Sequence, residues 1–476
     1  MSRTKIVATI GPASNNRDII RRLLHAGMNV ARINFSHGDH ETHSATIRLL
    51  RDVAKEERKV LAILGDLQGP KLRLGRFESF TVEAGDPVTI TVDPENTEAI
   101  FLPHPELFEA LQPGARLVLG DGEMELKIFA KTDTELLCTS TFNGKMEQRK
   151  GINTPGTRLP IESITEKDKE DLNLICALNL DFVAMSFVRS GEDILALRAL
   201  MAEQDTQIAI IAKIEKFEAI EELEGIAKEA DGLMVARGDL GIDLPPEQVP
   251  LIQKRIIRLG NKLGKPVITA TQMLQSMVDY PRPTRAEASD VANAVLDGTD
   301  AVMLSNETAS GKYPVESVQM MKNISIMMES EFPYDLWQQK RWEIARVGRT
   351  SDAISTASCS IAERIGAKLI VTSTMSGYTA EQISRHRPQT PILAVSPLPR
   401  TQRRLALVWG VECLMMGHVS DTDEMIERTV EAVASSMHLE AGDKLVMTSG
   451  VPFGRSGLTN LVQVHEITAE DVQRYR

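Results

Sequence analysis

Charged and hydroxyl-bearing side chains recur at the ends of short apolar runs in this chain of 476 residues. Arg32, Asn34 and Ser36 are spaced two residues apart, so an extended strand places all three on the same side. Lys213 and Glu215 have the same spacing and therefore also point the same way. Cations beside a carboxylate can position and neutralise a phosphate, so the pattern indicates chemistry on a phosphoryl group.

Further polar residues follow the neighbouring apolar runs. Taken alone, each would be an ordinary loop residue beside a strand. Polar groups at the ends of six runs favour a shared catalytic face instead. These further residues are Asp66, Arg237, Asp239, Thr269, Thr271, Ser305 and Glu307.

Two of the carboxylates suit a divalent metal. Glu215 and Asp239 offer hard oxygen ligands for Mg²⁺ (or Mn²⁺), whose shell water and substrate oxygens would complete. Gly238 would let backbone N–H groups approach an anion closely. With Arg32, Arg73 and Lys213 as phosphate-neutralising cations, the set of residues fits phosphoryl transfer.

Eight apolar runs could supply the strands that position these groups. Near-continuous apolar residues over this length predict strands buried on both faces. Helix signals lie between most of them, as from Asn16 to Gly27. Eight strand–helix units favour a closed TIM (β/α)8 barrel over an open doubly wound sheet. The runs are Lys5–Ile10, Val30–Phe35, Val60–Leu64, Phe182–Phe187, Ile208–Ile214, Gly232–Ala236, Pro266–Ala270 and Ala301–Leu304.

A different pattern separates the third run from the fourth. Residues 70–155 alternate polar and apolar side chains between Gly, Pro and Asp turns, as in Val88–Val92. This alternation predicts an inserted antiparallel β-barrel domain. Insertion after the third strand would place it over the carboxyl ends of the barrel strands, as a lid. The catalytic barrel domain is then residues 1–69 and 156–335.

The composition changes again after Pro333, and residues 336–476 predict a C-terminal α/β domain, which we expect to be regulatory. A helix from Thr350 to Gly366 precedes apolar strands, and such alternation is typical of an α/β layer. The expected strands are Lys368–Thr372, Pro391–Val395 and Lys444–Thr448.

Charge and composition exclude several classes of protein. With 54 basic and 66 acidic residues the net charge is −12, which predicts no affinity for nucleic acid or an acidic membrane. Four widely spaced cysteines suit a reducing compartment. The chain shows no apolar run long enough to cross a bilayer and no signal-peptide core. We therefore expect a soluble, cytoplasmic protein.

Six separated segments resemble the hallmark segments of the pyruvate kinase family, in the same order along essentially the whole chain. The segments are Thr4–Pro12, Ala31–Gly38, Ile210–Glu215, Met234–Gly241, Ala270–Leu274 and Pro283–Gly298. The resemblance implies transfer of the phosphoryl group of phosphoenolpyruvate to ADP, followed by protonation of enolpyruvate. It also implies a homotetramer.

The resemblance further implies a role for each matching residue. Lys213 would stabilise the transferring phosphoryl group, Glu215 and Asp239 would hold the metal, and Arg32 and Arg73 would contact phosphates. The implied nucleotide-binding positions are Asn34, His37 and Arg73.

The same resemblance assigns groups to the pyruvate moiety. The backbone near Ala236 and Gly238, with the Thr271 hydroxyl, would hold its carboxylate and carbonyl oxygens. The proton donor stays open between Thr271 and a water chain through Ser305 and Glu307.

One departure from the family pattern concerns potassium. Asn34, Ser36, Asp66 and the carbonyl of Leu67 would form a K⁺ shell. Members that need K⁺ carry Glu where this chain has Lys71, whose ammonium can supply the monovalent charge internally. We therefore predict that K⁺ is not required.

The C-terminal domain contains a candidate effector loop, defined by Thr374, Ser376, Gly377 and Thr379. Hydroxyls and a glycine at a helix start can cradle a phosphate. The loop is similar to the family's effector-phosphate loop, and Gly450–Gly457 resembles the segment facing it. We expect a phosphorylated allosteric effector, either a sugar phosphate or AMP.

Two other functions are compatible with parts of the pattern. A lyase or mutase acting on phosphoenolpyruvate or pyruvate could use a metal-dependent barrel, but it would need no nucleotide. A regulatory binding protein could keep the fold without the chemistry. Loss of Lys213, Glu215 or Asp239 would have indicated that second function, and all three are present.

Overall fold

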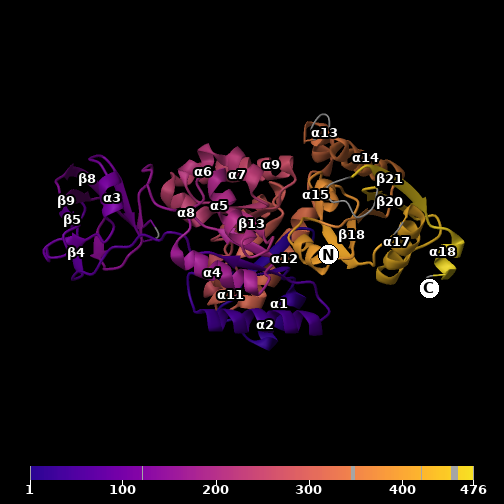
Figure 1. The fold of residues 1–476 in the computed structure, drawn as a ribbon, viewed down its shortest axis with the longest axis horizontal. Coiled ribbons are helices and arrows are strands. Elements are labelled where there is room, and N and C mark those ends of the chain that lie inside the picture. Colours follow the sequence, from indigo (N-terminus) through magenta and orange to yellow (C-terminus); the bar gives the residue numbers. More distant parts are fainter. Residues whose placement is uncertain (1, 121, 345–348, 420, 452–458, 475–476) are drawn as a thin grey trace.

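The computed structural model describes residues 2–120, 122–344, 349–419, 421–451 and 459–474. Three parts follow one another along the long axis of the molecule (Figure 1). The part between β3 and β12 lies at one end, the barrel is central, and the C-terminal part lies at the other end.

The central part is a closed barrel of eight parallel strands, as predicted, and not an open sheet. The order around the ring is β1-β16-β15-β14-β13-β12-β3-β2. The third strand begins and ends two residues later than its apolar run, so Asp66 lies inside it. The strands are β1 (Lys5–Thr9), β2 (Val30–Asn34), β3 (Ala62–Asp66), β12 (Phe182–Met185), β13 (Ala209–Ile214), β14 (Gly232–Ala236), β15 (Val267–Ala270) and β16 (Ala301–Leu304).

Helices surround the ring and bury their apolar faces against it. The first of them confirms its predicted limits, because Asn16 caps its start and Gly27 its end. The helices of the barrel part are α1 (Arg17–Ala26), α2 (His40–Glu56), α4 (Glu166–Ala177), α5 (Gly191–Ala202), α6 (Phe217–Glu221), α7 (Leu223–Glu229), α8 (Arg237–Asp243), η1 (Pro246–Gln248), α9 (Val249–Leu263), η2 (Gln275–Val278), α10 (Arg285–Leu296), α11 (Asn306–Ala309) and α12 (Pro314–Ser330). The next helix, α13 (Tyr334–Ile344), lies beside the C-terminal part (Figure 1).

The segment between β3 and β12 forms a separate β structure around its own core. Its strands make one six-stranded and one two-stranded sheet, with antiparallel pairing except between β5 and β6. We call this segment the inserted domain. Its elements are β4 (Phe80–Val82), β5 (Pro87–Thr91), β6 (Ile100–Phe101), α3 (Pro105–Ala110), β7 (Arg116–Leu119), β8 (Met124–Lys131), β9 (Glu135–Ser140), β10 (Gly144–Met146) and β11 (Ile152–Asn153).

The C-terminal part is a five-stranded α/β sheet of order β19-β18-β17-β20-β21. Its last strand runs antiparallel to β20. Neither edge strand, β19 or β21, was predicted from the sequence. The elements are α14 (Thr350–Ile365), β17 (Leu369–Ser373), α15 (Tyr378–Ser384), β18 (Ile392–Ser396), α16 (Pro399–Leu405), β19 (Val411–Met415), α17 (Thr422–Ser436), β20 (Lys444–Ser449), β21 (Leu461–Glu466) and α18 (Ala469–Arg474).

A buried arginine joins the C-terminal part to the amino-terminal end of the barrel. The Arg387 side chain is fully buried and donates to Asp300 Oδ1 at 3.1 Å. It also donates to Asn261 Oδ1 at 2.8 Å and to the Gly298 carbonyl at 2.7 Å. The guanidinium carbon lies 4.9 Å from the ring centre of Trp409. These contacts leave few of the arginine's N–H groups unpaired, as a buried cation requires.

Replacing this arginine tests how strongly it holds the two parts together. Arg387→Met would leave the buried Asp300 carboxylate without its cation, so we expect the free energy of unfolding to fall by about 3–5 kcal/mol. Urea unfolding followed by circular dichroism measures the change. The exposed Arg364→Met is the control, and an equal loss in both variants would contradict the assigned role.

Candidate active site

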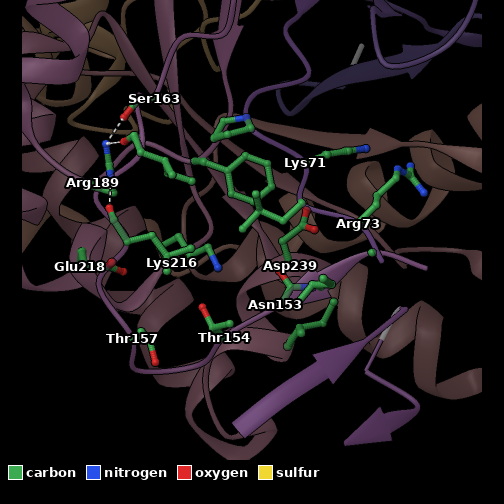
Figure 2. Close-up of a pocket in the computed structure, with 18 of the residues that line it drawn as sticks. Lys71, Arg73, Asn153, Thr154, Thr157, Ser163, Arg189, Lys216, Glu218 and Asp239 are labelled. Carbon is green, nitrogen blue, oxygen red and sulfur yellow. Dashed lines mark hydrogen bonds between the residues drawn. The ribbon is translucent and has the colours of Figure 1, made fainter. Parts of the chain in front are cut away.

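A cavity of about 210 Å³ lies between the inserted domain and the barrel. Figure 2 shows Lys71 and Arg73 of the connection to the inserted domain on one side of it, with Asp239 and Lys216 of the barrel nearby. These barrel residues follow β14 and β13, so the cavity lies at the carboxyl ends of the strands, where sites of such barrels occur.

The ammonium of Lys213, on β13, lies among acidic and hydroxyl groups. It donates to Ser186 Oγ at 2.6 Å and lies 2.8 Å from Glu215 Oε1 and 3.3 Å from Asp66 Oδ1. Burial alone would lower the pKa of Lys213, but Asp66, Glu215 and Asp239 together raise it above its ordinary value. The side chain is therefore a fixed positive charge at neutral pH.

Glu215 is buried beside the exposed Asp239. Its Oε2 accepts the backbone N–H of Phe187 at 2.7 Å. Burial raises the pKa of Glu215, and Asp239 raises it further against the opposite effect of Lys213. A divalent cation would relieve this repulsion between two carboxylates, so the pair fits the predicted metal ligands. No larger cluster of His, Cys, Asp or Glu able to hold a metal occurs in the described part of the chain.

A second fixed cation comes from β2. Arg32 donates through Nε to Asp66 Oδ2 at 2.7 Å and through Nη1 to Thr9 Oγ1 at 3.0 Å. Burial would raise the pKa of Asp66, but Lys213 and Arg32 lower it below its ordinary value. One ionised carboxylate therefore orients two of the three predicted phosphate-binding cations, Arg32 and Lys213.

The predicted carboxylate-binding groups meet where β14 and β15 end. The Gly238 N–H donates to Thr271 Oγ1 at 2.7 Å, and the Thr271 hydroxyl donates to the Ala270 carbonyl at 2.7 Å. Thr271 has a φ of +69°, a conformation that is uncommon for a β-branched residue. Arg237 donates to the carbonyls of Ala270 and Thr271 and thereby fixes this turn, directly after Ala236.

Glu307 is fully buried and lies in a structural position. Its Oε1 accepts the N–H of Leu274 at 3.0 Å, and its Oε2 accepts the N–H of Ser305 at 2.7 Å. The carboxylate thus holds the loops after β15 and β16 together. Whether a water chain passes through Ser305 and Glu307 stays a prediction.

The predicted potassium position is approached by a lysine. Lys71 Nζ donates to Ser36 Oγ at 3.4 Å, and the Ser36 N–H donates to Asn34 Oδ1 at 3.1 Å. The Leu67 carbonyl accepts a hydrogen bond from the Ser186 hydroxyl. The structure therefore brings the ammonium to one edge of the predicted shell.

The charges around Lys213 and Asp239 also affect the pKa of Lys71. Burial in the cleft and the charge of Lys213 lower the pKa of Lys71, against the opposite effect of Asp239. Arg73 is exposed at the cavity, where its Nη1 donates to the Arg149 carbonyl at 3.0 Å.

His37, the remaining predicted nucleotide contact, is exposed. Its backbone N–H donates to the Asn34 carbonyl at 3.4 Å. The structure thus keeps both residues on the same turn after β2.

The sequence analysis missed three residues that follow β12. Ser186 binds Lys213, Phe187 binds Glu215, and Arg189 donates to the Ser163 hydroxyl at the cavity wall (Figure 2). Ser186 could have been found, because it follows a strand as the other site residues do. The φ of +54° that aims the Phe187 N–H has no signal in a single sequence.

The candidate effector loop runs from the end of β17 into the first turn of α15. Gly377, at a φ of +94°, donates its N–H to Thr374 Oγ1 at 3.0 Å. The Tyr378 N–H donates to Ser376 Oγ at 3.4 Å, and the Thr379 and Thr459 hydroxyls share a hydrogen bond of 2.9 Å.

Most of the segment predicted to face this loop, residues 452–457, lies outside the described residues.

Comparison with protein families identifies the family of the chain. Residues 1–318 match a family model described as "Pyruvate kinase, barrel domain", and residues 352–465 match "Pyruvate kinase, alpha/beta domain". The chain belongs to the pyruvate kinase family. Lys213, Glu215 and Asp239 all lie within the matched barrel segment of that family.

Individual pyruvate kinases are similar over nearly the whole chain. "Pyruvate kinase 2" of Synechocystis sp. is 46% identical and "Pyruvate kinase" of Geobacillus stearothermophilus is 45% identical, each over 98% of this chain and 80% of its own length. The crystal structure of a pyruvate kinase from Cryptosporidium parvum matches with a TM-score of 0.93 and 35% identity. That match covers 98% of this chain and 96% of the other.

Among the described residues, no helix combines the length and the apolar character needed to cross a membrane.

Proposed function

We propose that this enzyme transfers the phosphoryl group of phosphoenolpyruvate to ADP and yields pyruvate and ATP, with Mg²⁺ or Mn²⁺ at Glu215 and Asp239. The observation that supports it best is the Lys213 ammonium, held 2.8 Å from Glu215 at the carboxyl ends of the strands. Membership of the pyruvate kinase family supports the same reaction. A lyase or mutase would leave the cavity formed with the inserted domain without a nucleotide to bind.

Side chains of the enzyme supply fixed positive charge to the transferring phosphoryl group. Loose phosphoryl-transfer transition states need positioned positive charge more than covalent help. Lys213 supplies such a charge, fixed by Ser186, and Arg32 supplies another, fixed by Asp66. When bound, the divalent cation supplies further charge neutralisation at the transferring oxygens.

The pyruvate moiety would lie against the turn after β14. There the Gly238 N–H and the Thr271 hydroxyl, which in this structure donate to Thr271 Oγ1 and to the Ala270 carbonyl, would turn to donate to its carboxylate. Thr271 is the better candidate for the proton donor, because both Glu307 oxygens already accept backbone N–H groups.

Three finer properties complete the proposal. We expect a homotetramer, in line with large apolar side chains exposed on the barrel at Leu251, Tyr280 and Met327. We expect a cytoplasmic enzyme, in line with four free cysteines. We also expect control by a phosphorylated effector at Thr374, Ser376, Gly377 and Thr379.

The first test removes the central cation. In Lys213→Met the transferring phosphoryl group loses a fixed charge, so kcat should fall by about 10³-fold or more. A coupled assay of pyruvate formation with ADP and Mg²⁺ measures it. Lys265→Met is the matched control, because Lys265 is a half-buried lysine at the other end of the barrel that binds the Ala230 carbonyl. Near-normal activity of Lys213→Met would refute the assigned role.

The second test concerns potassium. Since the Lys71 ammonium lies at Ser36, replacing NaCl with KCl at equal ionic strength should change the wild-type rate by less than about twofold. Lys71→Glu replaces the ammonium by a carboxylate that needs a cation, so KCl should activate that variant by about tenfold or more. Lys145→Glu, exposed on β10, should respond like wild type. Several-fold activation of wild type by KCl would be incompatible with the proposal.

The third test addresses the effector loop. The Thr374→Ala, Ser376→Ala double variant lacks two hydroxyl donors, so ribose 5-phosphate, fructose 1,6-bisphosphate or AMP should bind about tenfold more weakly. Isothermal titration calorimetry on the full chain gives the affinities, and Ser435→Ala on α17 serves as control. Unchanged affinity for every ligand that binds wild type, or no binding of any of them to wild type, would remove the site.

A further inference from the structure

The first two turns of α4 bind two loops that border the active site. One is the turn after β2, which carries Ser36, and we call residues 35–39 the serine turn. The other is the turn after β3, which carries Lys71, and we call residues 67–71 the lysine turn. The Lys71 ammonium bridges the two turns, because it donates to Ser36 Oγ at 3.4 Å. A hydrogen bond this long depends strongly on where both turns are held.

Lys167 of α4 holds the start of the serine turn. Its ammonium donates to the Phe35 carbonyl at 2.8 Å and to Asp171 Oδ2 at 2.6 Å. The Phe35 carbonyl and the Ser36 N–H belong to one planar peptide unit. Since that N–H donates to Asn34 Oδ1 at 3.1 Å, both sides of the peptide plane are fixed. The direction in which Ser36 leaves β2 is thereby set.

Asp171 holds the other end of the serine turn. Its Oδ1 lies 2.8 Å from Nε2 of His40, the first residue of α2, while its Oδ2 accepts from Lys167. Asp171 is buried, so its oxygens need donors of this kind. The serine turn is therefore held at both ends by the same helix.

Asp168, also on α4, holds the lysine turn. Its Oδ1 accepts the Gly69 N–H at 3.0 Å. Its Oδ2 accepts the N–H and the hydroxyl of Thr165, at 2.9 Å and 2.6 Å, in the capping box that starts α4. One buried carboxylate thus joins the start of the helix to the lysine turn.

The lysine turn is also confined on its other side. Gly69 has a φ of +68°, and a Cβ there would lie 2.6 Å from Phe187 Cδ2. The turn therefore packs directly against the residues that follow β12. Pro70 then restricts the rotation of the chain before Lys71. The position of Gly69 is passed on in this way to the backbone of Lys71.

We propose that the first two turns of α4 position the Lys71 ammonium against Ser36. Lys167 and Asp171 hold the serine turn, and Asp168 holds the lysine turn. These three are positioning residues, because they act through Lys71 and Ser36 and not on the substrate. This role rests on the proposed function, in which the Lys71 ammonium supplies the monovalent charge of the site. A lysine has a long flexible stem, so its ammonium is a fixed charge only where its backbone and its acceptor are both held.

A double-mutant cycle on pyruvate formation tests this role. Lys167→Met removes the bond to the Phe35 carbonyl, so kcat should fall about tenfold. In the Lys71→Met background the same substitution should change kcat by less than about twofold, because the ammonium that it positions is already absent. Lys167→Arg keeps a cation with several N–H donors, so its kcat should lie within about threefold of wild type.

Lys169→Met is the matched control for this cycle. Lys169 lies on the same helix with a side chain 39% exposed, against 47% for Lys167, but it pairs with Glu166. Its replacement should leave kcat within about twofold of wild type. Equal losses from Lys167→Met in both backgrounds would overturn the proposal, because a purely structural effect is independent of Lys71. A wild-type kcat in Lys167→Met would overturn it as well.

Acetylation of Lys71, read by mass spectrometry on the full chain without substrates, gives a measurement that does not depend on activity. Loss of the contact with Ser36 should raise the labelling rate about threefold in Lys167→Met and in Asp168→Asn. Glu287→Gln alters the same kind of capping box on α10 and should leave the rate unchanged. Labelling of Lys71 at the wild-type rate in either variant would overturn the proposal. Failure of the wild type to form pyruvate would instead refute the proposed function.

Discussion

The ionic cluster around Lys213 is the interaction on which the rest of the structure depends. A lysine, an arginine and two carboxylates are removed from water together, and each is costly to bury without its partners. Asp66 solves this problem by accepting from Arg32 on one oxygen and lying 3.3 Å from Lys213 on the other. The cluster draws on β2, β3 and β13, which the observed strand order brings to one side of the ring.

The two ends of the barrel use charge in different ways. At the carboxyl end the charges are held ready for a substrate, with Asp239 exposed and Glu215 buried behind it. At the amino end both terminal nitrogens of Arg387 donate to protein acceptors, and these contacts attach the C-terminal domain. The charges at the carboxyl end are thus available to bind a ligand, whereas the charge of Arg387 stabilises the contact between two domains.

Much of the fold and site could be predicted because each buried strand is a short apolar run, and the site residues are the polar residues that follow these runs. The apolar runs gave all eight barrel strands, and the spacing of Lys213 and Glu215 showed that they share a side. Other features arise only from tertiary structure. The antiparallel β21 is an edge strand without a continuous apolar run, and Phe187 reaches Glu215 through a backbone conformation that its side chain does not favour. The position of Glu307 after a strand suggested a catalytic role. In the structure its buried carboxylate accepts two backbone N–H groups, an arrangement that depends on the tertiary fold.

The place where the inserted domain leaves the barrel has a mechanical consequence. Strands β3 and β12 flank the insertion in sequence, but they pair directly with each other, from Phe182 with Leu64 to Ala184 with Asp66. The ring is therefore already complete without the chain that loops out between them. The inserted domain can therefore change its position about its two connecting segments without breaking any hydrogen bond between barrel strands. Opening and closing of the cleft then leaves the barrel unchanged.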